Sequence, residues 1–156
     1  SEVWHIFRVG RRARPVGVEV ALADRGLASS ASHSGYRHLT GRPNHRREVD
    51  VRDGGRLVVR DHVEGSGKHE VKGGWLLAPG WTVRKCDGGW LLTQGPAAVR
   101  LTVSSDVPIT TELDDAHHHP DYGVEETVSR IGWRYEGELP MSVVCVFAQR
   151  TLPDSL

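Results

Sequence analysis

The sequence predicts an all-β protein, an antiparallel two-sheet β-sandwich of about eleven short strands. Two observations support this prediction. Short apolar stretches with two-residue alternation recur along the chain, and glycine-rich turn sequences separate them at regular intervals. In addition, we find no convincing amphipathic helix in the sequence. At 156 residues the chain has the length of one domain, which we expect to span residues 1–156.

One hairpin organises the rest of the chain. Two alternating stretches, residues 45–51 and 57–63, flank the turn sequence Asp53-Gly54-Gly55. A two-residue loop would set Val49 opposite Arg60. A three-residue loop sets apolar residues opposite one another, so we expect that register. It requires a left-handed residue at the third loop position, which glycine adopts at no steric cost.

The same register makes a specific prediction about two charged residues. It sets Arg47 directly opposite Asp61 on the apolar face of the hairpin. A bidentate arginine–carboxylate pair there would be partly buried and charge-assisted, and we expect it to be structural. The alternative is that the sheet ends at this point and both side chains reach water.

The other strands follow from composition and alternation. Residues 3–9 are rich in aromatic and branched side chains, and residues 16–22 alternate Val or Leu with Gly, Glu and Ala. The remaining predicted strands are residues 27–33, 69–77, 88–92, 98–103, 109–113, 124–133 and 141–148.

The letters Gly-Gly-Trp-Leu-Leu occur at residues 73–77 and again at 88–92. We interpret the two copies as neighbouring strands. Trp75, Trp81 and Trp90 could stack on sugars, but beside leucines at strand spacing they are more typical of a core.

Charge limits the classes of partner. The formal net charge is zero, so no overall field directs the protein to nucleic acid or membrane, and no apolar run could span a bilayer. The distribution is uneven, because residues 1–72 carry 14 Lys and Arg against 9 Asp and Glu. A basic half suits an acidic partner. Cys86 and Cys145 are too few for a disulfide framework, and we expect two buried thiols.

Three groups of side chains are candidates for binding. The first lies around one loop and could contact an acidic sugar, with Tyr36 as an acid or a stacking ring; the alternative is a hydrogen-bonded loop. Its members are His33, Tyr36, Arg37 and His45. The second could face carboxylate or sulfate groups, or form a solvated turn. Its members are Arg11, Arg12 and Arg14.

The third group is a weak candidate for a metal site. His117, His119 and Asp121 have alternate spacing, and two histidines with a carboxylate can hold zinc. Pro120 restricts the segment to an edge or a loop, and no fourth ligand is evident. We therefore expect a solvated loop and no metal.

The order of several motifs resembles a known family. These motifs are Ser1-Glu2-Val3-Trp4, Phe7-Arg8-Val9, residues 33–37, His45-Arg46-Arg47, residues 59–65, residues 75–79, Tyr122-Gly123 and Leu139-Pro140. Together they are similar to the C-terminal sheet domain of heparinase II/III-like polysaccharide lyases. Where many relatives have a His-Leu pair, this chain has Leu76-Leu77, which weakens a catalytic role for that strand.

The resemblance implies a role within a larger enzyme. Such lyases cleave uronate-containing polysaccharides by β-elimination, which needs a base, a group that neutralises the carboxylate, and an acid. Relatives supply these mainly from a helical toroid and an upstream sheet segment, which we expect before Ser1. The chain would then support the toroid and wall the substrate cleft, with acidic polysaccharide, the toroid and the upstream segment as partners.

Catalysis by this chain alone is not expected, and Tyr36 is the weak candidate for a catalytic residue. No cofactor is expected here, although the resemblance leaves room for a divalent metal such as zinc in the full-length enzyme. For that enzyme an extracytoplasmic location is favoured. The alternative function is a stand-alone, non-catalytic carbohydrate-binding sandwich.

Overall fold

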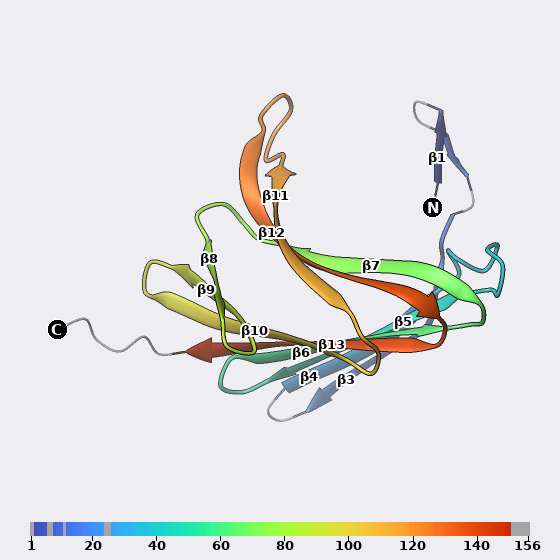
Figure 1. Cartoon of the computed structure of the whole chain (residues 1–156), viewed down its shortest axis with the longest axis horizontal. Coiled ribbons are helices and arrows are strands. Elements are labelled where there is room, and N and C mark those ends of the chain that lie inside the picture. The colour runs from blue at the N-terminus through green and yellow to red at the C-terminus, as the bar shows by residue number, and fades with distance from the viewer. Residues whose placement is uncertain (1, 6–7, 11, 24–25, 151–156) are drawn as a thin grey trace.

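The computed structural model describes residues 2–5, 8–10, 12–23 and 26–150, and this part of the chain consists of strands and loops without a helix. Eleven strands form two antiparallel sheets, and two further short strands form a separate hairpin (Figure 1). The predicted all-β sandwich is therefore confirmed. Over the same residues there is no helix with the length and apolar character needed to cross a membrane.

The larger sheet has eight strands, in the order β3-β4-β5-β6-β13-β10-β9-β8. Its strands are β3 (Pro15–Ala23), β4 (Gly26–His33), β5 (Asn44–Arg52), β6 (Arg56–Glu64), β8 (Thr82–Cys86), β9 (Gly89–Gln94), β10 (Ala97–Ser105) and β13 (Met141–Arg150). The C-terminal strand β13 thus lies in the middle of the sheet, paired with β6 on one side and β10 on the other.

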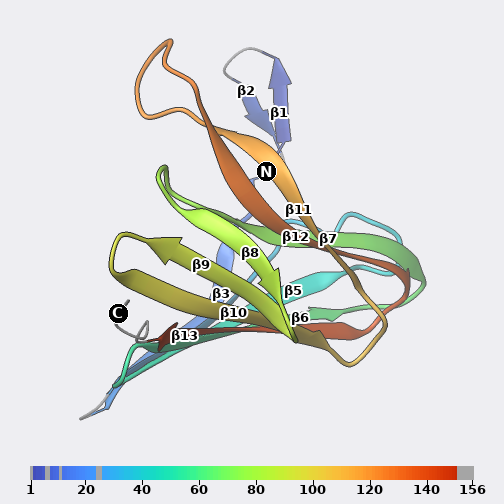
Figure 2. The same cartoon turned by 60° about the vertical axis from the view of Figure 1, so that its left-hand side comes forward.

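The smaller sheet has three strands, in the order β11-β12-β7. They are β7 (Lys68–Leu76), β11 (Thr110–His118) and β12 (Glu126–Glu138). The β11–β12 hairpin extends well beyond the body of the sandwich (Figures 1 and 2). The separate hairpin, β1 (Glu2–His5) with β2 (Arg8–Gly10), stands apart from the β11–β12 hairpin in Figure 1.

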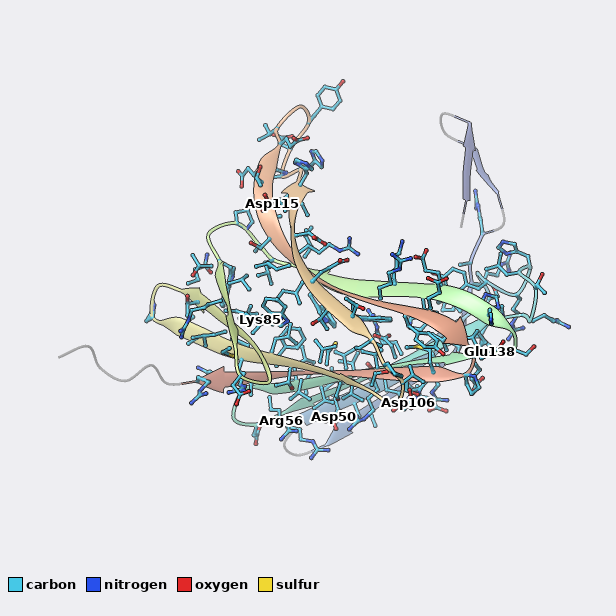
Figure 3. All side chains as sticks on the ribbon, viewed as in Figure 1. Asp50, Arg56, Lys85, Asp106, Asp115 and Glu138 are labelled. Atoms are coloured by element: carbon cyan, nitrogen blue, oxygen red, sulfur yellow. The ribbon has the colours of Figure 1, made fainter. Side chains whose placement is uncertain are left out.

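Apolar side chains from both sheets meet in one core, and side chains fill the space between the sheets (Figure 3). The larger sheet contributes Leu101, Val143 and Cys145, which are fully buried, and the smaller sheet contributes Ile131 and Trp133. Such burial is the dominant favourable contribution to folding.

The structure confirms most of the predicted core positions among the tryptophans and cysteines. Trp90 is buried, whereas Trp75 and Trp81 are partly buried against the core. Both cysteines are free thiols, of which Cys145 is buried and Cys86 only half-buried.

The organising hairpin has the predicted register. Strands β5 and β6 are joined by the three residues Asp53 to Gly55, and Val49 pairs with Val59. Arg47 pairs with Asp61, as the charge argument requires. Gly55 has φ = 70°, as predicted, and Gly54 also has a positive φ of 81°.

Three strand predictions were wrong. The stretch 3–9 is divided into β1 and β2, which pair with each other, because alternation does not distinguish one strand from two short ones. The two Gly-Gly-Trp-Leu-Leu copies are not neighbours: the first lies in β7 of the smaller sheet and the second in β9 of the larger one. Strand β8 was not predicted, since its sequence Thr-Val-Arg-Lys-Cys offers little apolar alternation.

Strand β3 forms one edge of the larger sheet and carries a row of exposed apolar side chains. Val18, Val20 and Leu22 are 61%, 66% and 84% exposed. The smaller sheet has three strands against eight, so it cannot cover the whole inner face. An uncovered, unpaired edge of this kind is available to pair with another chain or segment.

The hairpin turn generates a testable prediction. Gly54→Ala should lower the free energy of unfolding by about 1–2 kcal/mol, because alanine is strained in the left-handed region. Gly55→Ala should cost more, since its Cβ would also lie 2.9 Å from the Cβ of Gln149, whereas nothing lies within 4 Å at Gly54. Urea unfolding of both variants measures the difference. Equal losses would contradict the contact with Gln149.

Candidate functional site

The candidate site is built on the loop of residues 34–43, which joins β4 to β5. Backbone hydrogen bonds fold the loop into successive turns, from Leu39 N to Tyr36 O (3.0 Å) and from Arg42 N to Leu39 O (3.0 Å). The amide of Ser66 donates to Gly41 O (3.2 Å), which ties the loop to the turn after β6. A Cβ at Gly41 would collide with the Ser66 carbonyl, so this approach requires glycine.

A chain of hydrogen bonds runs from this loop into the larger sheet. His33, the last residue of β4, pairs with His45 on β5, and their Nε2 and Nδ1 atoms lie 3.2 Å apart. The Nε2 of His45 lies 2.7 Å from Oδ1 of Asp61 on β6. Arg47 donates to both oxygens of Asp61, from Nε at 2.7 Å and from Nη2 at 3.0 Å. The predicted pair and the predicted histidine cluster are therefore one network.

The donor and acceptor roles along this series of hydrogen bonds follow from its two ends, Asp61 and the N–H of Gly35. Asp61 as a carboxylate can only accept, so His45 carries its proton on Nε2 and accepts at Nδ1. His33 must then donate from Nε2. Its Nδ1 is left to accept from the backbone N–H of Gly35, 3.2 Å away. All four groups are satisfied when both imidazoles are neutral.

Asp61 is the most deeply buried member, with its side chain 3% exposed. Burial raises its pKa, but the hydrogen bonds from His45 and Arg47 lower it by more, so the pKa of Asp61 lies below its ordinary value of 3.8. The carboxylate is thus ionised at neutral pH. A buried charge is tolerated because every partner is a donor.

Arg47 reaches from Asp61 toward the surface and remains 46% exposed. Its guanidinium lies 5.5 Å from the ring centre of Trp75, at a cation–π distance. Trp75 packs edge-on against Phe147, with ring centres 5.0 Å apart. Burial raises the pKa of the nearby Cys145 thiol above its ordinary value of 9.0, which leaves this thiol protonated and unreactive.

A pocket of about 210 Å³ lies beside this network. Its wall combines side chains from β5, β7, β12 and the loop, among them Tyr36, Leu39, His45, Arg47, Lys72 and Trp133. An apolar wall with a few polar groups is typical of a small-ligand site. Sequence reasoning missed Lys72 and Trp133, because they enter from the smaller sheet and only the packing of the two sheets reveals them.

The structure brings two of the predicted groups together at the loop. The ring of Tyr36 meets the ring of His33 edge-on at 5.0 Å, and the Tyr36 side chain is half-exposed. Arg14 lies beside the loop, since Ser34 N donates to Arg14 O (3.1 Å) and Arg14 N donates to Ser34 Oγ (3.2 Å). Arg12 and Arg37 are exposed, whereas Arg11 lies outside the described residues.

The weak metal candidates do not converge. His117 and His119 both face Glu125, with nitrogen–oxygen distances of 3.0 and 3.9 Å. Asp121 instead accepts from the backbone N–H of Tyr122. Wherever side chains are described, no three His, Cys, Asp or Glu residues could hold a metal ion together. The donors around Asp61 do not fit a metal either, because Arg47 already occupies both of its oxygens.

The fold and site define a β-sandwich domain with a pocket between its two sheets and the β4–β5 loop. A family model described as "Heparinase II/III-like, C-terminal" matches residues 1–150. The chain belongs to this family, as the order of its motifs implied.

Solved structures agree in fold. A heparinase III with methylated lysines has a TM-score of 0.71 and 16% identity, covering 86% of this chain and 21% of that one. The heparan sulfate lyase HepC of Pedobacter heparinus has a TM-score of 0.70 and 10% identity, covering 91% of this chain and 22% of that one. A further heparinase III has a TM-score of 0.69 and 12% identity, covering 90% of this chain and 22% of that one. The chain thus spans about a fifth of these proteins. No curated protein matches.

The buried carboxylate generates a prediction about stability. Arg47→Met retains an aliphatic stem beside Trp75 but removes two donors from Asp61. We expect the free energy of unfolding at pH 7 to fall by about 2–3 kcal/mol, less than for a fully buried pair because Arg47 is half-exposed and His45 still donates. Urea unfolding measures this loss.

The pH dependence of the same variant provides a second measurement. In the wild type the lowered pKa of Asp61 contributes stability above 3.8 that is lost as the pH falls through the folded-state pKa. Without Arg47 the folded-state pKa of Asp61 rises, so the stability difference between variant and wild type should shrink as the pH falls through the variant's pKa and close below the wild-type pKa, which lies under 3.8. Arg52→Met is the control, since Arg52 pairs with Asp50 at the surface. Equal losses for the two variants would refute the importance of burial.

Proposed function

We propose that this chain is the part of a polysaccharide lyase that supports the helical toroid and forms one wall of the substrate cleft, without catalysing elimination alone. The observation that carries the proposal is the match of a C-terminal family over residues 1–150, by a chain that spans about a fifth of the solved heparinases. The substrate class would be an acidic, uronate-containing polysaccharide.

The chemistry of the site supports a non-catalytic role. β-Elimination needs a base that can reach the proton beside the carboxylate, with a geometry close to a hydrogen bond. Both nitrogens of His33 and both nitrogens of His45 are engaged in internal hydrogen bonds. The network is therefore committed to holding the loop, and the substrate-facing groups would be Tyr36, Arg37 and the arginines before β3.

The first prediction concerns activity. The purified chain should give no increase in the absorbance of unsaturated uronate with heparin, heparan sulfate or alginate, because the groups that relatives place upstream are required for elimination. The assay is run beside a complete lyase as the positive control. Turnover that is lost on Tyr36→Phe would overturn the proposal and assign Tyr36 as an acid.

The second prediction concerns binding. The chain should bind heparin weakly, and the binding should weaken with salt because ionic contacts at the surface are screened. Replacing Arg11, Arg12 and Arg14 together with Ser should reduce the binding, as measured by affinity chromatography or calorimetry.

A matched control for this experiment removes the same charge elsewhere. Arg56, Arg84 and Arg130 are exposed and lie on β6, β8 and β12. Their triple Ser variant should retain more binding than the variant at Arg11, Arg12 and Arg14. Salt-independent binding, or equal binding of neutral glucans, would instead favour the stand-alone carbohydrate-binding sandwich.

A further inference from the structure

We propose that the hydrogen-bond chain from Gly35 through His33 and His45 to Asp61 is a proton-operated latch, which holds the loop of residues 34–43 beside the pocket while both histidines are neutral. Protonation of His33 releases the loop. The proposal rests on the geometry of these residues and does not depend on the lyase assignment.

Each group in the hydrogen-bond chain has a fixed role as donor or acceptor, so one extra proton on His33 breaks a hydrogen bond. The Nδ1 of His33 accepts the backbone N–H of Gly35. A proton on Nδ1 of His33 would make this nitrogen a donor like the Gly35 N–H, and two donors cannot bond each other. The imidazolium cannot relieve the conflict by exchanging the roles of its nitrogens, because both would carry protons. The contact is tight, since a Cβ at Gly35 would lie 2.9 Å from Nδ1 of His33.

Charged and titratable groups surround His33 from several elements. His45 faces it from β5, Asp61 lies beyond His45 on β6, and Arg47 lies beyond Asp61. The loop contributes Tyr36, Arg37 and His38, and Arg14 lies beside the loop. The neighbouring pocket, whose wall does not include His33, is lined by His69, Glu70 and Lys72 from β7. Asp61 is already engaged by His45 and Arg47, so it does not pair directly with His33.

This environment disfavours a proton on His33 in the closed state. Partial burial, and next the neighbouring His45, lower the pKa of His33 below its ordinary value of 6.5. Opening of the loop would expose His33 to water and so raise its affinity for the proton. The closed state therefore binds fewer protons than the open state, so closure is favoured above pH 6.5 and is lost as the pH falls through the closed-state pKa.

The segment that the latch controls belongs to the pocket. Tyr36 and Leu39 both line it, and the ring of Tyr36 rests on His33. Both ends of the loop are anchored independently of His33, through Ser34 and Arg14 at one end and through Gly41 O and the amide of Ser66 at the other. Release of His33 would thus move the segment between these anchors, which carries Tyr36. Protonation would change access to Arg47 in the pocket wall.

Amide hydrogen exchange of the whole ¹⁵N-labelled chain tests the latch. The protection factor of the Gly35 amide should fall about tenfold between pH 7.5 and pH 5.5, while core amides such as that of Val143 keep theirs. His33→Gln keeps a donor toward His45 but cannot be protonated, so its Gly35 protection should not depend on pH. His117→Gln removes a histidine from the distant β11–β12 hairpin and should behave like the wild type.

Two further measurements guard against a misfolded variant. His33→Asn retains an acceptor for Gly35 and also lacks a titrating group, so it should be equally insensitive to pH. In the wild type, imidazole ¹⁵N shifts should identify Nε2–H tautomers for His33 and His45 at pH 7.5. Unchanged Gly35 protection in the wild type, a persisting pH response in both His33 variants, or Nδ1–H tautomers would overturn the proposal.

Discussion

The buried carboxylate of Asp61 is the constraint on which the rest of this end of the domain depends. A charge in the interior must be surrounded by donors, and Asp61 has three donor contacts, one from His45 and two from Arg47. This requirement fixes the register of β5 on β6. It also orients His45, which in turn sets the tautomer of His33 and the position of the loop that follows.

One wall of the pocket depends on close packing within the smaller sheet. Trp133 on β12 lies against Gly73 on β7, where a Cβ would collide with the indole ring. The missing side chain lets the ring approach the backbone of the neighbouring strand and close one side of the pocket. The opposite side is the loop carrying Tyr36. One wall is therefore set by core packing and the other by hydrogen bonds to histidines.

Sequence reasoning reached the parts of the fold that local chemistry decides. The register of the hairpin was predictable because a shift of one residue would oppose Val49 to Arg60. The hydrogen-bonded link from His33 through His45 to Asp61 was not predicted. It requires β4 to pair with β5, and the sequence indicates no charged partner for His33. The partners of His117 were missed for a similar reason, because Glu125 lies across a turn of unpredicted shape. The two Gly-Gly-Trp-Leu-Leu strands look alike in sequence, and only the topology assigns them to different sheets.

The position of β13 has a consequence for how the chain reaches its fold. The C-terminal strand pairs with β6, so that residues 141–148 meet residues 56–63, and it also pairs with β10. Until β13 emerges from the ribosome, the larger sheet consists of two separate halves, β3 to β6 and β8 to β10. Each half then presents an unpaired edge on the side where β13 will enter. Assembly at the centre of the larger sheet therefore requires β13, and the long separation of the paired strands favours slow folding.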